Sequence, residues 1–178
     1  MLQKARHIYE MRDPDGDEVN QIDVTITDCL YSLRRYEEAA QCAERCLQFA
    51  LEFYYRISEE RFGRAHLNLA RCLQKLGELQ RAISYLRQLC DMKDYHEDPI
   101  MVEVCEMMAE TLMQQGEYEA AEQYFNRVMY IREQVERDEK GVLSTNLAIA
   151  TCFKQRGEFL EAERILNECM VKGGILFG

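Results

Sequence analysis

The sequence predicts an all-α protein in which antiparallel helix pairs stack one after another as an α-solenoid. A short motif of glycine, glutamate and a large apolar residue occurs three times, beginning at Gly77, Gly116 and Gly157. Each copy is followed by an alanine, and together with Ala39 these alanines are 43, 39 and 41 residues apart. Only two prolines and nine glycines interrupt the 178 residues, which suits long helices. A repeat of this period is typical of solenoid proteins.

The first helix of each repeat is predicted from apolar and small residues at fixed distances before the alanine. These residues occupy positions i, i+1 and i+4, which lie on one face of a helix. In chain order the four sets are Ile26-Thr27-Leu30, Leu69-Ala70-Leu73, Met108-Ala109-Leu112 and Ile149-Ala150-Phe153. We expect each set to be buried against neighbouring helices.

The glycine of each motif is expected to end the first helix, because a helix commonly stops at a residue in the left-handed conformation that glycine adopts most easily. The first repeat departs from this pattern. Arg34 occupies its glycine position and Thr27 its small-residue position, so we interpret it as a degenerate copy.

The second helix is predicted from a stripe at i, i+4 and i+7 that starts at the alanine. The four stripes are Ala39-Ala43-Cys46, Ala82-Leu86-Leu89, Ala121-Phe125-Val128 and Ala162-Leu166-Cys169. These residues form one stripe of the second helix, which packs with the first as a helix, tight turn, helix unit.

This pattern resembles the tetratricopeptide repeat, most clearly in Leu69-Ala70, Gly77-Glu78-Leu79 and Ala82 with their counterparts in the next two repeats. The tryptophan and the closing proline of that family's motif are missing from all four repeats. The unit is longer than the usual ~34 residues, and in this it looks like the repeats of kinesin light chains and of LGN-type polarity adaptors. The resemblance implies a right-handed superhelix whose first helices line a concave groove. It also implies a non-catalytic adaptor or scaffold that binds a peptide segment of a partner protein.

The expected organisation is a series of repeats with an incomplete unit at the start. Residues 1–12 continue the stripe of a second helix and are interpreted as the tail helix of a preceding repeat. The following repeats are expected at 17–58, 60–94, 99–137 and 139–172, with a frayed tail at 173–178. This organisation predicts a fragment of a longer array. The alternative is a complete small protein, capped by its own N-terminal helix and by the tail Ile175-Leu176-Phe177.

Composition narrows the classes of partner. The net charge of −10 disfavours nucleic acid and anionic membranes as partners. No apolar stretch approaches the ~18 residues of a membrane span, and the N-terminus has no apolar signal core. Eight cysteines without a secretion signal indicate a reducing compartment, so we expect a cytoplasmic protein, with the nucleus as an alternative. The expected partner is a protein or peptide.

The cysteines and histidines are interpreted as packing residues. Cys29, Cys72 and Cys152 share one repeat position, and Cys46 and Cys169 share another. The tetratricopeptide pattern takes small residues at both positions, where cysteine packs as a small hydrophobe. His66 stands where the motif has tryptophan. Because the sequence has no C-x2-C pair and no glycine-rich phosphate loop, we expect neither an enzyme nor a metal or cofactor site.

The candidate binding residues are the non-core positions of the first helices. Arg64, Arg71 and Lys75 form a basic strip, and Glu103, Glu106 and Glu110 form an acidic strip. By resemblance, Asn68 is expected to hydrogen-bond a peptide backbone. The predicted groove set is Tyr31, Arg64, Asn68, Arg71, Lys75, Glu103, Glu106, Glu110 and Lys154.

Three alternatives to peptide binding in the groove remain open. The charged strips could pair across adjacent helices and only keep the groove solvated. The chain could be an assembly or dimerisation spacer that self-associates through uncapped ends. It could also be a regulatory-subunit segment of a larger complex.

Overall fold

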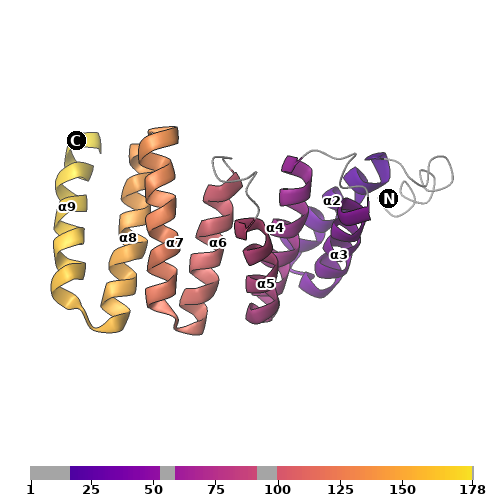
Figure 1. Ribbon diagram of the computed structural model, residues 1–178, viewed down its shortest axis with the longest axis horizontal. Helices are drawn as coiled ribbons and strands as arrows, with labels where there is room; N and C mark the ends of the chain where they lie inside the picture. Colours follow the sequence, from indigo (N-terminus) through magenta and orange to yellow (C-terminus); the bar gives the residue numbers. More distant parts are fainter. Residues whose placement is uncertain (1–16, 53–58, 92–99, 178) are drawn as a thin grey trace. The chain divides into compact units, whose positions relative to one another are not determined.

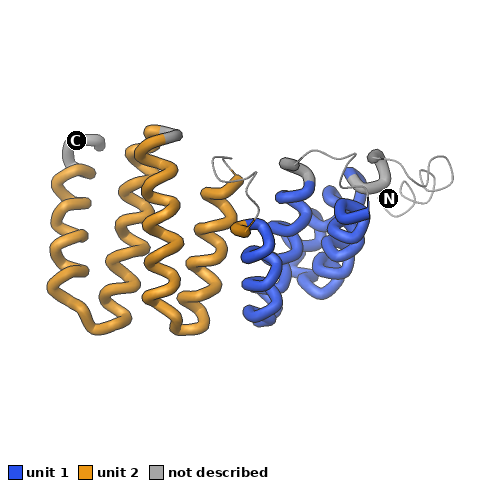
Figure 2. Tube along the Cα trace, in the orientation of Figure 1, with its two compact units in different colours: residues 1–89 blue, residues 90–178 orange. Residues whose placement is uncertain are grey.

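The computed structural model describes residues 17–52, 59–91 and 100–177, so the expected tail helix at 1–12 lies outside the described residues. The chain divides into two compact units, residues 1–89 and 90–178 (Figure 2). Each unit is described by itself below.

Unit 1 consists of consecutive antiparallel helices (Figure 1). They are α2 (Asp17–Ser32), α3 (Tyr36–Glu52), α4 (Glu59–Leu76) and α5 (Leu79–Asp91), whose last two residues belong to unit 2. Helix α3 packs against both α2 and α4. The first helices α2 and α4 also contact each other, which places the non-core positions of two repeats on one surface.

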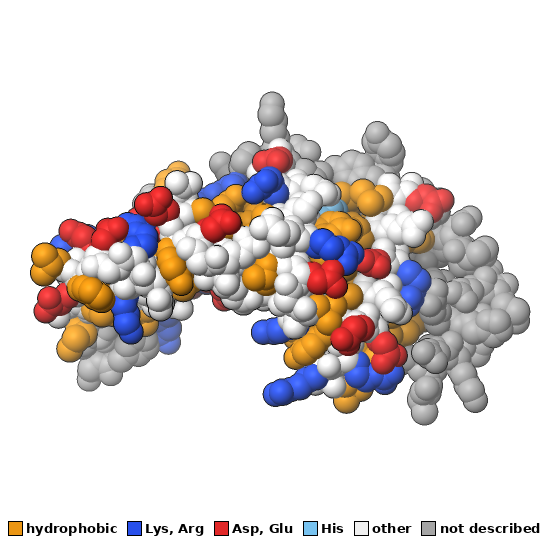
Figure 3. All heavy atoms as spheres, turned by 90° about the horizontal axis from the view of Figure 1, so that it is seen from below, with side chains coloured by type: hydrophobic (Ala, Val, Ile, Leu, Met, Phe, Trp, Pro, Cys, Tyr) orange, Lys and Arg blue, Asp and Glu red, His pale blue; other side chains and the backbone are white. Residues whose placement is uncertain are grey.

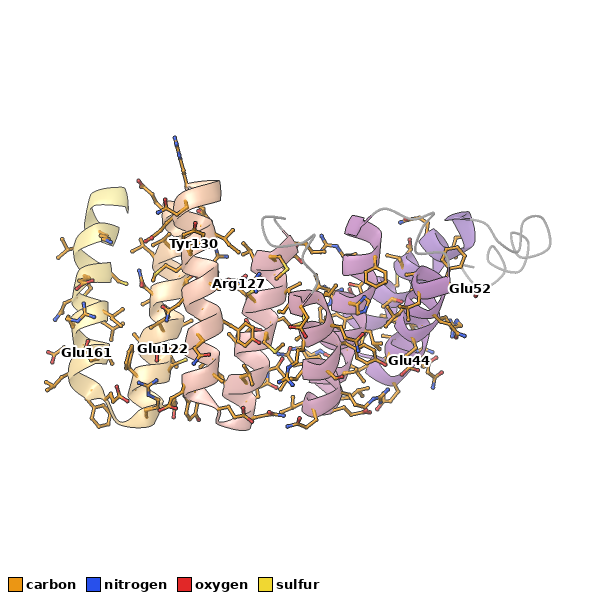
Figure 4. The ribbon with its side chains drawn as sticks, in the orientation of Figure 1. Glu44, Glu52, Glu122, Arg127, Tyr130 and Glu161 are labelled. Atoms are coloured by element: carbon orange, nitrogen blue, oxygen red, sulfur yellow. The ribbon has the colours of Figure 1, made fainter. Side chains whose placement is uncertain are left out.

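Unit 2 repeats this arrangement. Its helices are α6 (Ile100–Gln115), α7 (Tyr118–Ile131), α8 (Glu139–Arg156) and α9 (Phe159–Phe177), with a π-helical turn η3 (Arg132–Glu136) after α7. Each α-helix packs on the next. Figure 4 labels Glu122 of α7, whose carboxylate pairs with Arg156 of α8. The described ranges contain helices and no strand, so the predicted all-α solenoid of helix pairs is confirmed.

Most of the predicted core positions are buried in both units, whereas Leu30 and Phe153 are half-buried. The small residues Ala70 and Ala109 and the alanines that anchor the second helices are almost fully enclosed. Thr27 is buried as well, and its hydroxyl donates to the carbonyl oxygen of Asp23 at 2.8 Å. A buried hydroxyl needs such a partner, which explains how threonine replaces alanine in the first repeat.

The turns share one backbone geometry. Gly77, Gly116 and Gly157 have φ of 79°, 83° and 83°, and Arg34 has φ of 60°. After each of these residues, the next backbone N–H donates back to a carbonyl five residues earlier at 2.9 Å, as Glu78 does to Leu73 and Arg35 does to Leu30. Arg34 therefore makes the turn of a true repeat, in a conformation that favours glycine.

Three expectations about the ends of the array are wrong. Cys29 is exposed, and Leu166 is 41% exposed, although their repeat positions predict burial. Both residues belong to terminal described helices, α2 and α9, where a neighbouring helix is missing from the described chain on one side. The tail expected to fray at 173–178 is helical through Phe177. Its glycines each cost about 1 kcal/mol relative to alanine, which is too little to end a helix flanked by apolar residues.

Candidate functional site

The first-helix surface of unit 1 centres on Arg71 of α4. One guanidinium nitrogen, Nη2, donates to Asp28 Oδ1 at 3.0 Å and to Asn68 Oδ1 at 3.1 Å. The guanidinium carbon lies 4.6 Å from the ring centroid of Tyr31, within the range of a cation–π contact. We call Asp28, Tyr31, Asn68 and Arg71 the Arg71 cluster. The structure thus brings together Tyr31, Asn68 and Arg71 from the predicted groove set.

Burial separates the roles within the Arg71 cluster. The Arg71 side chain is 35% exposed, whereas Asn68 is only 5% exposed and uses its amide oxygen on Arg71. Tyr31 is half-buried and is held by an edge-to-face contact with Tyr36 at 5.3 Å. Asp28 is the most exposed member at 54%, and Arg71 is the accessible cation of the cluster, oriented by its contacts with Asn68 and Tyr31.

The rest of the basic strip flanks Arg71 on α4. Arg64 is half-buried seven residues before it, and Lys75 is exposed four residues after it. These spacings correspond to two turns and one turn of helix, so the three cations share a face. A surface of this kind favours carboxylate groups.

Unit 2 carries a second polar cluster around Arg132, which follows α7. Its Nη1 lies 2.8 Å from Glu106 Oε1 on α6 and donates to Thr145 Oγ1 on α8 at 2.6 Å. The same nitrogen donates to the carbonyl oxygen of Gly141 at 3.2 Å. We call Glu106, Arg132, Gly141 and Thr145 the Arg132 cluster. With its side chain only 13% exposed, Arg132 ties together α6, η3 and α8.

The start of α8 is shaped to accept Arg132. Asp138 caps the helix by accepting from the backbone N–H of Gly141 at 3.0 Å. A Cβ at position 141 would lie 2.1 Å from Asp138 Oδ2 and 2.6 Å from Arg132 Nε. Both distances are shorter than any normal contact, so the cap and the buried arginine require glycine here.

The Arg132 cluster changes how the acidic strip is interpreted. Glu106 is half-buried and bound to Arg132, whereas Glu103 and Glu110 are exposed on α6, and Lys154 is exposed on α8. The sequence analysis missed Arg132, Gly141 and Thr145. The repeat register could not reveal Arg132, because it lies in the connection between repeats, whose length varies.

A pocket of about 560 Å³ opens beside Arg132 in unit 2. Arg137 and Lys172 add further cations to its wall, and Glu133 and Glu139 oppose them. The view in Figure 3 likewise shows cationic, anionic and apolar side chains interspersed on one face of the described chain. Both the pocket wall and this face therefore carry positive and negative side chains together.

His66 and four of the cysteines that share repeat positions are core groups, as predicted. His66 Nδ1 lies 3.0 Å from the carbonyl oxygen of Phe62, and burial lowers the pKa of the imidazole. Burial raises the pKa of Cys46 to about 12 and that of Cys72 to about 11, and Cys152 and Cys169 are buried too. In the described ranges no three metal-binding side chains gather in a way that could hold an ion. Among the same residues, no helix is long and apolar enough to cross a bilayer.

Consecutive helix pairs, glycine-type turns and enclosed small residues define an α-solenoid of helix–turn–helix repeats. Sequence profiles of the tetratricopeptide repeat match residues 63–96 and 103–170, together more than half of the chain. The chain belongs to the tetratricopeptide repeat superfamily. No curated protein sequence matches it significantly.

Several solved structures share the fold at low sequence identity. A kinesin light chain-type protein of Podosopora anserina with nearly identical TPR-like repeats superimposes with a TM-score of 0.83 at 16% identity, covering 99% of this chain and 85% of that one. BtubC (BKLC) from P. vanneervenii gives 0.81 at 18% identity, with coverage of 99% and 75%. A Rap protein complexed with Competence and Sporulation Factor gives 0.69 at 16% identity, with coverage of 98% and 57%.

Proposed function

We propose that this chain is a non-catalytic protein-interaction module that binds an acidic peptide segment of a partner protein, with Arg71 as the anchor. The observation that carries this proposal is the preorganised guanidinium of Arg71. Asp28, Asn68 and Tyr31 hold it from α2 and α4, yet about a third of the side chain stays exposed. An arginine fixed before binding loses less conformational entropy when it forms a new hydrogen bond.

The surroundings of Arg71 support a carboxylate as its ligand. Arg64 and Lys75 lie on the same face of α4, so the successive carboxylates of an acidic segment can meet three cations along about three helical turns. Membership of a superfamily of repeat proteins also supports an interaction role, because such arrays present extended binding surfaces. One structure with this fold was solved as a complex with Competence and Sporulation Factor.

The test is a peptide selection followed by measured affinities. A peptide library is panned against the chain, and the selected peptides are titrated by fluorescence polarisation against wild type and Arg71→Ala. Loss of a charge-assisted hydrogen bond, worth about 1.5 kcal/mol, weakens binding roughly tenfold. The matched control is Arg81→Ala, which removes an exposed, paired arginine from the second helix α5. Binding that is unchanged in Arg71→Ala, or a selection without acidic peptides, refutes the proposal.

Asn68→Ala tests the positioning role. It leaves all three cations in place but removes the acceptor that orients Arg71. We expect weaker binding of the same peptides, with circular dichroism confirming the fold. Wild-type affinity in Asn68→Ala would show that the orientation of Arg71 does not matter.

A further inference from the structure

Helix α9 carries an apolar face that no described element covers. Phe159 and Leu160 at its start are 67% and 83% exposed, Leu166 is 41% exposed, and Met170 and Val171 are 75% and 67% exposed. Spacings of 7 and 11 residues bring these side chains to one side of the helix after two and three turns. Figure 3 shows hydrophobic side chains at the α9 end of unit 2, and Figure 4 labels Glu161 in the first turn of α9. We call these five residues the α9 face.

The other repeats serve as an internal reference for this face. Leu166 corresponds to Ala43, Leu86 and Phe125, all of which are buried. Leu166 is therefore exposed at a position where the other three repeats bury their side chain. Leu160 and Val171 differ, because the equivalent positions of the other three second helices are exposed and mostly polar. Those equivalents are Glu37, Gln80 and Glu119 for Leu160, and Gln48, Asp91 and Tyr130 for Val171. Stacking of a regular repeat does not require apolar residues there, so the α9 face is wider than a repeat interface needs.

The arrangement of the α9 face is self-complementary. The pair Phe159-Leu160 lies at one end of the face and the pair Met170-Val171 at the other. Leu166 lies near the middle, and the exposed polar residues Glu163 and Asn167 lie between the two apolar pairs. In an antiparallel pair of α9 helices related by a two-fold axis near residue 165, each apolar end meets the opposite apolar end. The Glu163 carboxylate then faces the Asn167 amide, an acceptor opposite a donor. Self-complementarity of this kind is what a two-fold interface requires, and antiparallel helix dipoles favour it.

The exposed area is sufficient for such an interface. A fully exposed large apolar side chain offers about 150–200 Å², so the exposed fractions of the five residues correspond to roughly 500–670 Å² per chain. Two copies would bury roughly 1,000–1,300 Å², which reaches the ~1,000 Å² expected of a specific interface. We propose that the α9 face is a dimerisation surface, and that its occupant is the α9 face of a second copy of this chain.

The first test measures mass against concentration. Light scattering and sedimentation equilibrium of the whole chain, from low micromolar to near millimolar, should show a monomer–dimer equilibrium. Leu160→Glu/Met170→Glu should remain monomeric over that range. The control Leu33→Glu/Leu51→Glu adds the same charges to exposed leucines of unit 1 and should dimerise as wild type does. A monomeric wild type, an unaffected Leu160→Glu/Met170→Glu variant, or a ladder of growing oligomers overturns the proposal.

The second test addresses the antiparallel pairing. Asn167→Glu places two carboxylates opposite each other twice per dimer and should weaken association at least tenfold. Mixing it with Glu163→Lys chains should restore a dimer containing one chain of each kind, because the introduced ammonium group then faces the introduced carboxylate. Failure of the mixture to associate, with both chains folded by circular dichroism, would rule out this geometry. Neither test involves Arg71, so the dimer can fail while the peptide site stands.

Discussion

Alanine substitutions at two glycines of unit 2 should change stability in opposite directions. Gly116 has φ of 83° and Gly173 lies within helix α9, and an added Cβ would meet nothing within 4 Å at either site. Steric contact is therefore absent at both positions, and only the backbone conformation differs. An L-residue in the left-handed region costs about 1–2 kcal/mol, whereas alanine gains about 1 kcal/mol over glycine inside a helix.

The net values follow once the unfolded chain is included. Replacing glycine by alanine lowers the conformational entropy of the unfolded state, which stabilises the protein by roughly 0.4–1 kcal/mol. Gly116→Ala should thus destabilise by about 0.5–1 kcal/mol, and Gly173→Ala should stabilise by about 1 kcal/mol. Arg34→Gly reverses the first change in unit 1, because Arg34 has φ of 60°. It should stabilise by about 0.5 kcal/mol.

Urea unfolding followed by far-ultraviolet circular dichroism measures these differences. The midpoints should shift while the dependence on urea concentration stays constant, which shows that the unfolding unit is unchanged. Equal signs for Gly116→Ala and Gly173→Ala would refute the reasoning. A destabilised Arg34→Gly would show that the Arg34 side chain contributes more than its backbone strain costs.

Three further outcomes follow from the buried groups. Gly141→Ala should destabilise by more than about 2 kcal/mol, well beyond Gly116→Ala in the same urea assay, because its Cβ would overlap the Asp138 cap and Arg132; a cost equal to that of Gly116→Ala would contradict this. Glu106→Ala should destabilise by about 2 kcal/mol, because it leaves a mostly buried arginine without its carboxylate. The double variant Glu106→Ala/Arg132→Met should recover part of that loss. Equal loss of stability in both variants would argue against the ion pair. Stability should fall as the pH rises above about 9. The Cys46 thiol of the unfolded chain ionises near pH 9, whereas burial raises its pKa in the folded protein to about 12. Urea midpoints of wild type and Cys46→Ala test this, and the variant should lose less stability between about pH 8 and 10.

The repeat register predicted core residues that recur in each helix pair, and it missed features that occur in only one place. Leu69-Ala70 and Ala82 could be placed in the core because stacking imposes the same environment on each copy. The same logic failed for Leu166 and Cys29, which lie in the last and first helices that the structure describes, where the packing environment differs from that of the inner helices. Arg132 escaped for a different reason. The connection between α7 and α8 is not periodic, and the arginine reaches α6 and α8 only after the chain has folded.

The contacts of the candidate site were only partly predictable for a related reason. The register placed Asp28 and Arg71 at the same position of successive repeats, and the structure shows that adjacent first helices bring such positions into contact. A charge on this surface therefore has a neighbour determined by the previous repeat. The sequence placed Asn68 and Arg71 on one helix surface, but the difference in their exposure depends on packing, which the pattern of charges does not reveal.

This neighbour relation leads to a last prediction about affinity. Asp28 holds Arg71 at 3.0 Å, so a ligand carboxylate has to compete with a carboxylate that is already present. Asp28→Asn removes the competing charge, while Asn68 and the Tyr31 ring still orient the guanidinium. Acidic peptides should bind Asp28→Asn more tightly than wild type by roughly threefold to tenfold, in line with a gain of about 1 kcal/mol. The gain should shrink at high salt. Fluorescence polarisation with the same peptides measures it. Weaker binding would mean that Asp28 positions Arg71 more than it opposes the ligand, and that the two carboxylates do not compete.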